Sequence, residues 1–413
     1  MSKLTRRDAV FVFFAFAVAY FLSALIRSIT ATISPTLTSE LAMGAKDLGL
    51  LAGGYFLGFA ATQLPLGHWL DRHGPKRVIL CLLSVAVVGC IAFSWASGFS
   101  GLLLARILCG VGVSACLMAP LTGYRRWFDS ATLMRANSWM LMSGSLGMVA
   151  STLPVQWLLP IFGWRALFVG LAVLLALAML LIYWQVPAWS KNPIAANTSI
   201  EQSTPSSGYS QVWALPYFRK MVPIGFFTYG GLVAMQTLWV VPWMTRVAGY
   251  TPIEAATGLF WLNIGMLVSF WLWGLLSPWL VRRGLHPVRL ITVGIPLSFL
   301  ALGLIIFAAG SLGRWTALAL TIYCITCTFV SLAQPAVGMA FPPNLAGRAL
   351  SAYNLVIFSG VFTIQWGIGL LIDGFKALGW PEVASFQAAL SVFLICCIGS
   401  YVHFLLSPGT KKS

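Results

Sequence analysis

Apolar residues occupy most of the chain in long runs, and short polar links separate these runs. A bilayer core of about 30 Å requires about 20 helical residues, and each run reaches that length. The pattern predicts an all-α membrane protein with twelve transmembrane helices. The predicted spans are approximately 9–35, 47–70, 77–96, 100–123, 132–157, 165–186, 221–245, 254–280, 288–309, 315–339, 349–372 and 383–406.

One link is much longer than the others. Residues 187–218 are rich in Pro, Ser, Asn and Thr, and they follow the sixth predicted span. Such a composition is typical of a linker. We therefore expect an N-terminal six-helix half at 1–186, a cytoplasmic linker at 187–218 and a C-terminal six-helix half at 219–413.

Short sequence patterns recur in the same order in both halves, which indicates an internal repeat. Because six predicted spans separate the copies, the halves have the same orientation. We expect two parallel six-helix repeats, with the solute path between them. The recurring pairs are Trp69–Gly74 with Trp279–Gly284, Pro120 and Gly123 with Pro335 and Gly338, Arg135 with Arg348, and Gly163-Trp164 with Gly379-Trp380.

The composition excludes a soluble protein, because 59% of the residues are hydrophobic and only 8% are charged, against about 25% charged in soluble domains. The net charge of +16 does not indicate a nucleic-acid partner, since the basic residues punctuate the apolar runs. Of the 25 lysines and arginines, 18 fall in links on the side of the N-terminus and 5 on the opposite side. This bias predicts that both termini are cytoplasmic. The short loops favour a bacterial inner membrane.

No group of residues indicates an enzyme. No arrangement of nucleophile and base or of metal ligands is apparent, and we expect neither a metal nor a cofactor. The eight cysteines, including Cys324 and Cys327, lie in apolar spans, where thiols usually behave as small hydrophobic groups. We expect a monomer whose partners are the lipid bilayer and a small-molecule anion.

The link after the second span carries a recognisable motif. It reads Gly-His-Trp-Leu-Asp-Arg-His-Gly-Pro-Lys-Arg over residues 67–77. This resembles the loop signature G-x-x-x-D-R-x-G-R-R/K-x of the major facilitator superfamily, and the twelve spans and the repeat extend that resemblance over the whole chain. The branch that it resembles is that of the anion and organophosphate permeases. The matching positions are Gly67, Asp71, Arg72, Gly74, Lys76 and Arg77.

The resemblance implies that this loop gates one conformation of a transporter and does not bind substrate. Gly67 and Gly74 are expected to allow a close helix approach and a tight turn. Asp71 is expected to face the positive N-terminus of another helix, at the eleventh span near Arg348.

The fourth span contains Arg106 followed by Gly110 and Gly112, which resembles a second signature of the superfamily, R-x-x-x-G-x-G. Glycines at this spacing allow helices to pack closely. Two interpretations of Arg106 remain open: a buried arginine that carbonyls or a neighbouring helix satisfy, or a residue that takes part in coupling or in attracting the substrate.

Arg27 lies within the first span, eight residues before Pro35 and about 12 Å from it along a helix. A charge at such a depth costs about 2.5–3.5 kcal/mol, and no acidic residue shares an apolar run with it. The first span is similar to that of organophosphate and anionic-sugar transporters of the superfamily, in which this arginine grips the anion. A guanidinium suits carboxylate and phosphate because it donates to two oxygens at once. A structural arginine is the alternative.

The seventh span departs from the phosphate-ester exchangers, which carry a second arginine where this chain has Gln236. A carboxylate-type solute is therefore expected rather than a phosphate dianion. The residues that we expect to bind it are Arg27, Tyr55, Gln236, Trp239, Asn354 and Gln365.

Together these features predict a secondary transporter that moves a small organic anion by rocker-switch alternating access. Two alternatives stay open: efflux of drugs or of neutral or amphipathic solutes, and a transporter-like solute sensor. No titratable residue is evident in the predicted path, so ion coupling, anion exchange and facilitated diffusion are all compatible with the sequence.

Overall fold

The computed structural model describes residues 4–189, 205–284 and 286–407, and these contain helices but no strand. In the first half, all helices except α5 are long and follow one another with short turns. They are α1 (Arg6–Glu40), α2 (Ala45–His73), α3 (Pro75–Trp95), α4 (Phe99–Val113), α5 (Met118–Trp127), α6 (Ser130–Ala150) and α7 (Leu153–Gln185).

The second half contains more interruptions. The seventh predicted span is a chain of α-helical and π-helical segments: α10 (Pro216–Pro223), η1 (Ile224–Tyr229), α11 (Gly230–Ala234), η2 (Met235–Trp239) and α12 (Val240–Arg246). The later elements are α13 (Pro252–Arg282), α14 (Pro287–Ala308), the 3₁₀ segment η3 (Ala309–Trp315), α15 (Thr316–Cys327), the 3₁₀ segment η4 (Thr328–Leu332), α16 (Ala333–Met339), α17 (Pro343–Ala377) and α18 (Glu382–Leu406).

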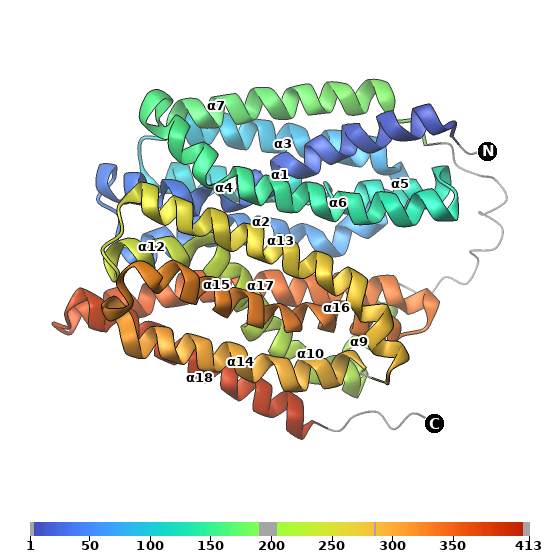
Figure 1. Ribbon diagram of the computed structural model, residues 1–413. Helices are drawn as coiled ribbons and strands as arrows, with labels where there is room; N and C mark the ends of the chain where they lie inside the picture. The colour runs from blue at the N-terminus through green and yellow to red at the C-terminus, as the bar shows by residue number, and fades with distance from the viewer. Residues whose placement is uncertain (1–3, 190–204, 285, 408–413) are drawn as a thin grey trace.

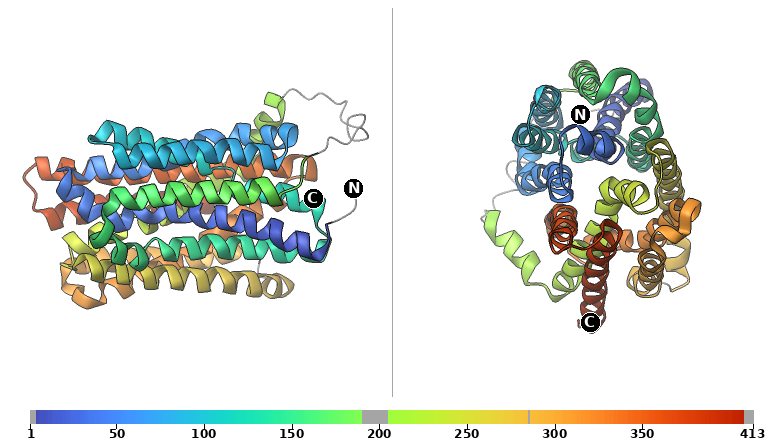
Figure 2. Two further views of the ribbon diagram at one scale, coloured as in Figure 1. Left: turned by 90° about the horizontal axis from the view of Figure 1, so that it is seen from above. Right: turned by 90° about the vertical axis from the view of Figure 1, so that its left-hand side faces the viewer.

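The long helices run side by side as an elongated bundle (Figure 1). Helices of the first half, blue to green, occupy one side of the bundle, and helices of the second half, yellow-green to red, occupy the other. Both termini lie at the same end, which we call the terminal end; the opposite end, with the turns at 41–44 and 378–381, is the far end. The end-on view in Figure 2 places the two groups of helices face to face.

Nine helices among the described residues are long and apolar enough to cross a membrane. One of them, Pro287–Met339, covers 53 residues, which is long enough for two crossings. The predicted number of twelve is therefore not reproduced one for one, although the all-α membrane architecture is confirmed. α2 is not among the nine, and its 29 residues include Asp47, Asp71 and Arg72.

The internal repeat is also visible in the backbone. Gly74 and Gly284 both have positive φ, +78° and +80°, and so do Gly163 and Gly379, at +72° and +85°. These are two of the pairs that recur between the two halves of the sequence. Glycine adopts this left-handed conformation without steric cost, and it therefore ends helices at equivalent turns.

Besides the seventh, three predicted spans are interrupted where the sequence patterns gave no sign of it. The fourth breaks between α4 and α5, the fifth breaks between α6 and α7, and the tenth passes through η4 between α15 and α16. Gly163, inside α7, separates the end of the fifth predicted span from the sixth. The predicted linker, 187–218, lies partly outside the described residues; its described part contains α9 (Pro205–Ala214).

The two halves meet along α2 and α17, which run antiparallel. A Cβ atom at Gly49 would lie 2.3 Å from the Gln365 carbonyl oxygen, and one at Gly369 would lie 2.3 Å from that of Ala45. Only glycine permits such an approach of two backbones. Closer to the middle, the rings of Phe59 and Phe358 lie 4.5 Å apart. This contact surface is called the seam below.

Candidate functional site

Arg27 lies on α1 in the interior of the bundle, where aromatic side chains surround it. Its guanidinium carbon is 5.8 Å from the centre of the Phe59 ring, within the range of a cation–π contact. The phenol groups of Tyr20 and Tyr55 lie within reach of the guanidinium, and Tyr229 lies near both Arg27 and Tyr20. The site therefore draws on both halves of the chain.

The charge of Arg27 has no acidic partner among the residues that the structure describes. Its Nε atom is buried and has no hydrogen-bond partner, although the side chain as a whole is partly exposed. A buried donor without an acceptor costs about 1–3 kcal/mol. The arrangement is therefore suited to an anion that supplies the missing acceptor and charge.

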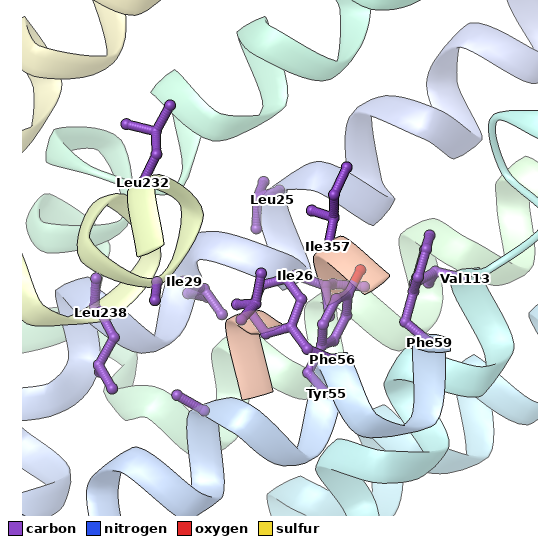
Figure 3. Packing of buried hydrophobic residues seen from close by; sticks show 14 of the residues in the cluster. Leu25, Ile26, Ile29, Tyr55, Phe56, Phe59, Val113, Leu232, Leu238 and Ile357 are labelled. Atoms are coloured by element: carbon purple, nitrogen blue, oxygen red, sulfur yellow. The ribbon is translucent and has the colours of Figure 1, made fainter. Parts of the chain in front are cut away.

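Tyr55 links the Arg27 site to the packing of the bundle (Figure 3). Its ring is fully buried and lies at 5.2 Å from that of Phe56, with Ile26 of α1 and Ile357 of α17 nearby. Its hydroxyl donates to the Ser23 carbonyl at 3.4 Å. Such packing on several sides holds the phenol group in place beside Arg27.

Arg106 has a different environment. It is fully buried, and its Nη1 donates to the Ile26 carbonyl at 3.0 Å. Its Nη2 donates to Thr30 Oγ1, and its guanidinium lies 5.3 Å from the Tyr55 ring. These partners are all on α1 and α2, so the side chain fastens α4 to its neighbours.

The glycines after Arg106 bring α4 against two other helices. A Cβ atom at Gly110 would lie 1.9 Å from the Tyr55 carbonyl oxygen, and one at Gly112 would lie 2.2 Å from the Ala86 nitrogen. Helix α4 thus touches the backbones of α2 and α3, as the sequence pattern predicted.

The remaining predicted binding residues are buried and hydrogen-bonded to other side chains or to the backbone. Gln236 Nε2 donates to Asn263 Oδ1 at 2.7 Å, and Asn354 Oδ1 accepts from Gln334 Nε2 at 2.6 Å. Gln365 Nε2 donates to Thr237 Oγ1 at 3.0 Å, and Trp239 Nε1 donates to the Gln365 carbonyl at 3.2 Å. These bonds join helices of the second half. Tyr55 is the predicted binding residue that lies beside Arg27.

The loop at residues 67–77 is largely open. Asp71, Arg72 and Arg77 are exposed, and no ion pair or hydrogen bond reaches Asp71 from the described part of the chain. The expected contact of Asp71 near Arg348 is therefore absent from this conformation. Although the Asp71 side chain is largely exposed, protein atoms displace some of the water around its carboxyl and so raise its pKa above the ordinary value, and His68 opposes this rise.

The glycines of the loop differ from each other. Gly74 forms the expected tight turn, and a Cβ atom there would lie 2.2 Å from Trp189. The prediction of a close helix approach at Gly67 is wrong for this structure, because nothing lies within 4 Å of a Cβ atom at that position. Lys76 lies 5.1 Å from the centre of the Tyr183 ring.

The predicted binding residues leave out four neighbours of Arg27, namely Tyr20, Phe59, Cys116 and Tyr229. Phe59 follows Tyr55 by one helical turn on α2, so both side chains lie on one face. That spacing could have identified Phe59. Cys116 lies near Arg27 and Ser23, in the break between α4 and α5, and no signal in the sequence predicted that break.

The fold and the loop motif are those of a membrane transporter. The family model of the Major Facilitator Superfamily matches residues 16–365, and the chain belongs to this superfamily. The crystal structure of a bacterial homolog of the human lysosomal transporter Spinster, in an inward-facing and unoccupied conformation, resembles the present structure with a TM-score of 0.79. The sequences are 17% identical, and the match covers 98% of each chain, so this likeness concerns the fold alone.

Two curated relatives are more similar in sequence. The chain is 23% identical to the probable L-galactonate transporter of Escherichia coli (strain K12) over 316 residues, which are 70% of this chain and 65% of that protein. It is 24% identical to the gallate transporter of Pseudomonas putida over 406 residues, which are 87% of this chain and 86% of that protein.

Proposed function

We propose that the protein is a secondary transporter for a small organic anion that carries a carboxylate, and that Arg27 binds this carboxylate. The guanidinium of Arg27 carries the proposal. It lies in the interior of a membrane protein, it has no acidic partner among the described residues, and its Nε lacks an acceptor. A carboxylate would neutralise the charge and accept from two nitrogens at once.

The neighbours of Arg27 favour a solute with a single negative group. The phenol group of Tyr20 can donate a further hydrogen bond to a bound oxygen, whereas the Tyr55 hydroxyl already donates to the Ser23 carbonyl. Among the described residues no second arginine offers its Nη atoms here, because those of Arg106 donate to α1. One guanidinium balances one carboxylate. The names of the two relatives, a galactonate and a gallate transporter, denote carboxylates and support this choice.

Transport by this site requires that its two sides open in turn. We infer that residues 1–186 and 219–413 rock against each other about the Arg27 site as rigid units, with both termini in the cytoplasm of a bacterial cell. Tyr229 of the second half lies near Arg27 of the first. A solute held between them would contact both units and link its binding to their motion.

Uptake into liposomes that contain the purified full-length protein tests the proposal. Galactonate, gallate, a phosphate ester, a neutral sugar and a cationic dye would be compared. We expect carboxylate uptake by the wild-type protein, reduced about tenfold or more in Arg27→Gln because a charge-assisted hydrogen bond contributes about 1.5–3 kcal/mol. Arg27→Lys keeps the positive charge but cannot donate to two oxygens at once, so its uptake should lie between those of the wild type and Arg27→Gln.

Arg314→Gln is the matched control, because Arg314 is exposed at the far end of the bundle and should leave uptake unchanged. The proposal fails if Arg27→Gln transports every accepted solute as well as the wild type does. Uptake of the dye driven by a pH gradient, without carboxylate uptake, would support an efflux transporter instead.

A further inference from the structure

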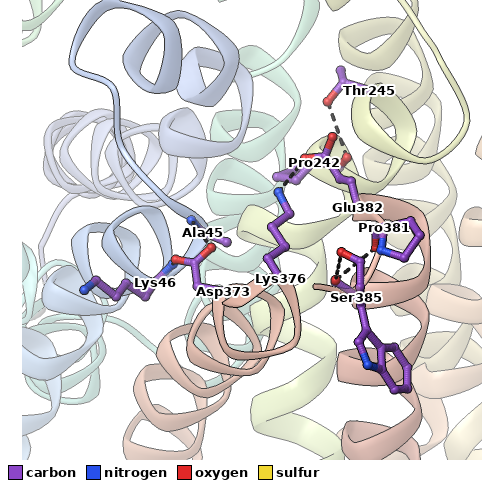
Figure 4. Close-up of polar contacts among 10 residues, drawn as sticks. Ala45, Lys46, Pro242, Thr245, Asp373, Lys376, Pro381, Glu382 and Ser385 are labelled. Carbon is purple, nitrogen blue, oxygen red and sulfur yellow. Dashed lines mark hydrogen bonds and ion pairs between the residues drawn. The ribbon is translucent and has the colours of Figure 1, made fainter. Parts of the chain in front are cut away.

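The seam between the halves is closed at the far end by a contact between a side chain and a backbone. Asp373 lies in the last two turns of α17, and its carboxylate reaches the first residues of α2 (Figure 4). The Ala45 N–H donates to Asp373 Oδ1 at 3.1 Å, and the Lys46 N–H donates to Oδ2 at 2.8 Å. The two oxygens thus accept from two consecutive amides across the seam.

The N-terminus of α2 depends on acceptors supplied by side chains other than that of its own capping residue. The first amides of a helix have no partner within the helix, and its N-terminus carries a partial positive charge. The capping residue is Gly44, which has no side chain that could accept a hydrogen bond from these amides. Asp47 accepts from the Gly44 N–H at 3.3 Å, and Asp373 satisfies the next two amides.

Asp373 in turn gains little from its own helix. A negative charge near the C-terminus of a helix is disfavoured by the helix dipole, so α17 alone does not stabilise this carboxylate. The neighbouring cation is occupied elsewhere: Lys376 Nζ lies 2.7 Å from Glu382 Oε1. The Lys46 side chain points away from Asp373 in Figure 4. The start of α2 is therefore its main partner.

Gly44 makes this approach possible. A Cβ atom at position 44 would lie 2.7 Å from Asp373 Oδ2, which is too short for a non-bonded contact. The backbone there has φ −72°, a value that any residue can adopt. A larger residue would thus disturb the carboxylate without straining the turn.

The contact lies next to the backbone packing of Gly369 on Ala45, but another part of the far end is less well filled. A cavity of about 230 Å³ lies beside the contact, with Ser34 and Leu48 of the first half and Trp239 and Lys376 of the second among its lining residues. Side chains of the two halves therefore do not fill the far end completely. A polar contact that crosses the seam beside this cavity therefore contributes a larger share of the stability of the closed far end than it would in a fully packed region.

We propose that Asp373 is the gating residue of the far end: its carboxylate locks α17 onto the N-terminus of α2 and must leave it each time the far end opens. This inference rests on the proposed alternating-access transport. It assigns the lock to the pair of Asp373 and the amides of residues 45 and 46, with Gly44 as the position that admits the carboxylate.

Spin-label distances across the far end test this proposal without any solute. The labels are attached at Ser39→Cys and Leu378→Cys, which lie on opposite halves. The full-length protein that carries them has the accessible Cys81 and Cys396 changed to Ser. We expect Asp373→Asn to move the ratio of closed to open molecules toward open by on the order of tenfold, given the strength of charge–helix-end contacts. Gly44→Ala should shift it in the same direction.

Asp47→Asn is the matched control. It removes a carboxylate from the same helix end, but from within α2, so it should leave the distance distribution unchanged. Each variant is first compared with the wild type by elution profile and thermal midpoint. If Asp373→Asn does not fold, Gly44→Ala tests the same contact in its place.

The gating proposal is overturned if Asp373→Asn and Gly44→Ala both keep the wild-type distances, or if Asp47→Asn shifts them equally. Its outcome is separate from that of the Arg27 proposal. If the distances shift but uptake does not depend on Arg27, the gating proposal holds and the anion-site proposal fails. If the distances stay unchanged but uptake depends on Arg27, the anion-site proposal holds and the gating proposal fails.

Discussion

At the scale of single residues, the two arginines of the bundle interior, Arg27 and Arg106, show how strongly the surroundings determine the role of a side chain. Both lie in apolar runs without an acid. The Nε atom of each has no hydrogen-bond partner. Arg106 is fully buried and both of its Nη atoms donate to α1, whereas Arg27 is partly exposed and has phenol groups around its guanidinium. The first is engaged by the protein, and the second has donors to spare for a ligand.

This contrast predicts different results for the same substitution. Arg106→Gln should lower the free energy of unfolding by about 2–4 kcal/mol, because it leaves buried acceptors on α1 without their donor. Arg27→Gln should unfold at nearly the wild-type temperature. Tryptophan fluorescence during heating in detergent measures both. An Arg106→Gln protein of wild-type stability that has lost uptake would instead place Arg106 in the transport path.

At the scale of helices, glycines determine which backbones touch. Gly110 and Gly112 bring α4 onto α2 and α3, and Gly49 and Gly369 bring α2 onto α17. Helix association within a membrane gains little from the hydrophobic effect, so close packing of this kind holds the bundle together. Helix α2 therefore contacts both its own half and the opposite one through small residues.

Gly110→Ala tests the importance of this packing. Its Cβ atom would meet the Tyr55 carbonyl oxygen at 1.9 Å, so α4 must move away from α2, and we expect a loss of about 1–3 kcal/mol of stability. Gly170→Ala on α7 is the control, because nothing lies within 4 Å of a Cβ atom there; it should be neutral or slightly stabilising. Equal thermal midpoints for the two variants would contradict the role assigned to Gly110.

The sequence predicted most helices well because hydrophobic length and glycine spacing are local properties. The tight turn at Gly74 and the close packing at Gly110 were both anticipated from their motifs. The break after Val113 and the pairing of Gln236 with Asn263 were not, because both depend on which helices become neighbours. A polar side chain in an apolar span has the same appearance whether it binds a solute or another helix.

At the scale of the whole molecule, the residues at the two ends of the seam have different surroundings. Glycine packing and the Asp373 contact join the halves at the far end, while nothing lies within 4 Å of a Cβ atom at Gly67 and Asp71 is exposed at the terminal end. A rocking motion that opens the far end would bring the terminal ends of α2 and α17 together. Asp71 would then approach the N-terminus of α17, a favourable place for a negative charge.

Asp71→Asn should therefore favour the present conformation. Loss of some of the water around the largely exposed Asp71 carboxyl raises its pKa, which means that the folded protein binds this proton more tightly than the unfolded chain does. The free energy of unfolding that this proton contributes is therefore lost as the pH rises through the range just above the ordinary aspartate pKa. The variant should lose this pH dependence in thermal unfolding and differ from the wild type by no more than about 0.5 kcal/mol at neutral pH, because the side chain is exposed.

The same spin-label distance at the far end then distinguishes the two acids. Asp71→Asn removes a charge that stabilises the opposite conformation, so it should raise the closed fraction, whereas Asp373→Asn should lower it. The double variant should lie between the two single ones, because sites so far apart act independently. Shifts in the same direction would contradict a rigid rocking of two halves, since closing one end would no longer be linked to opening the other.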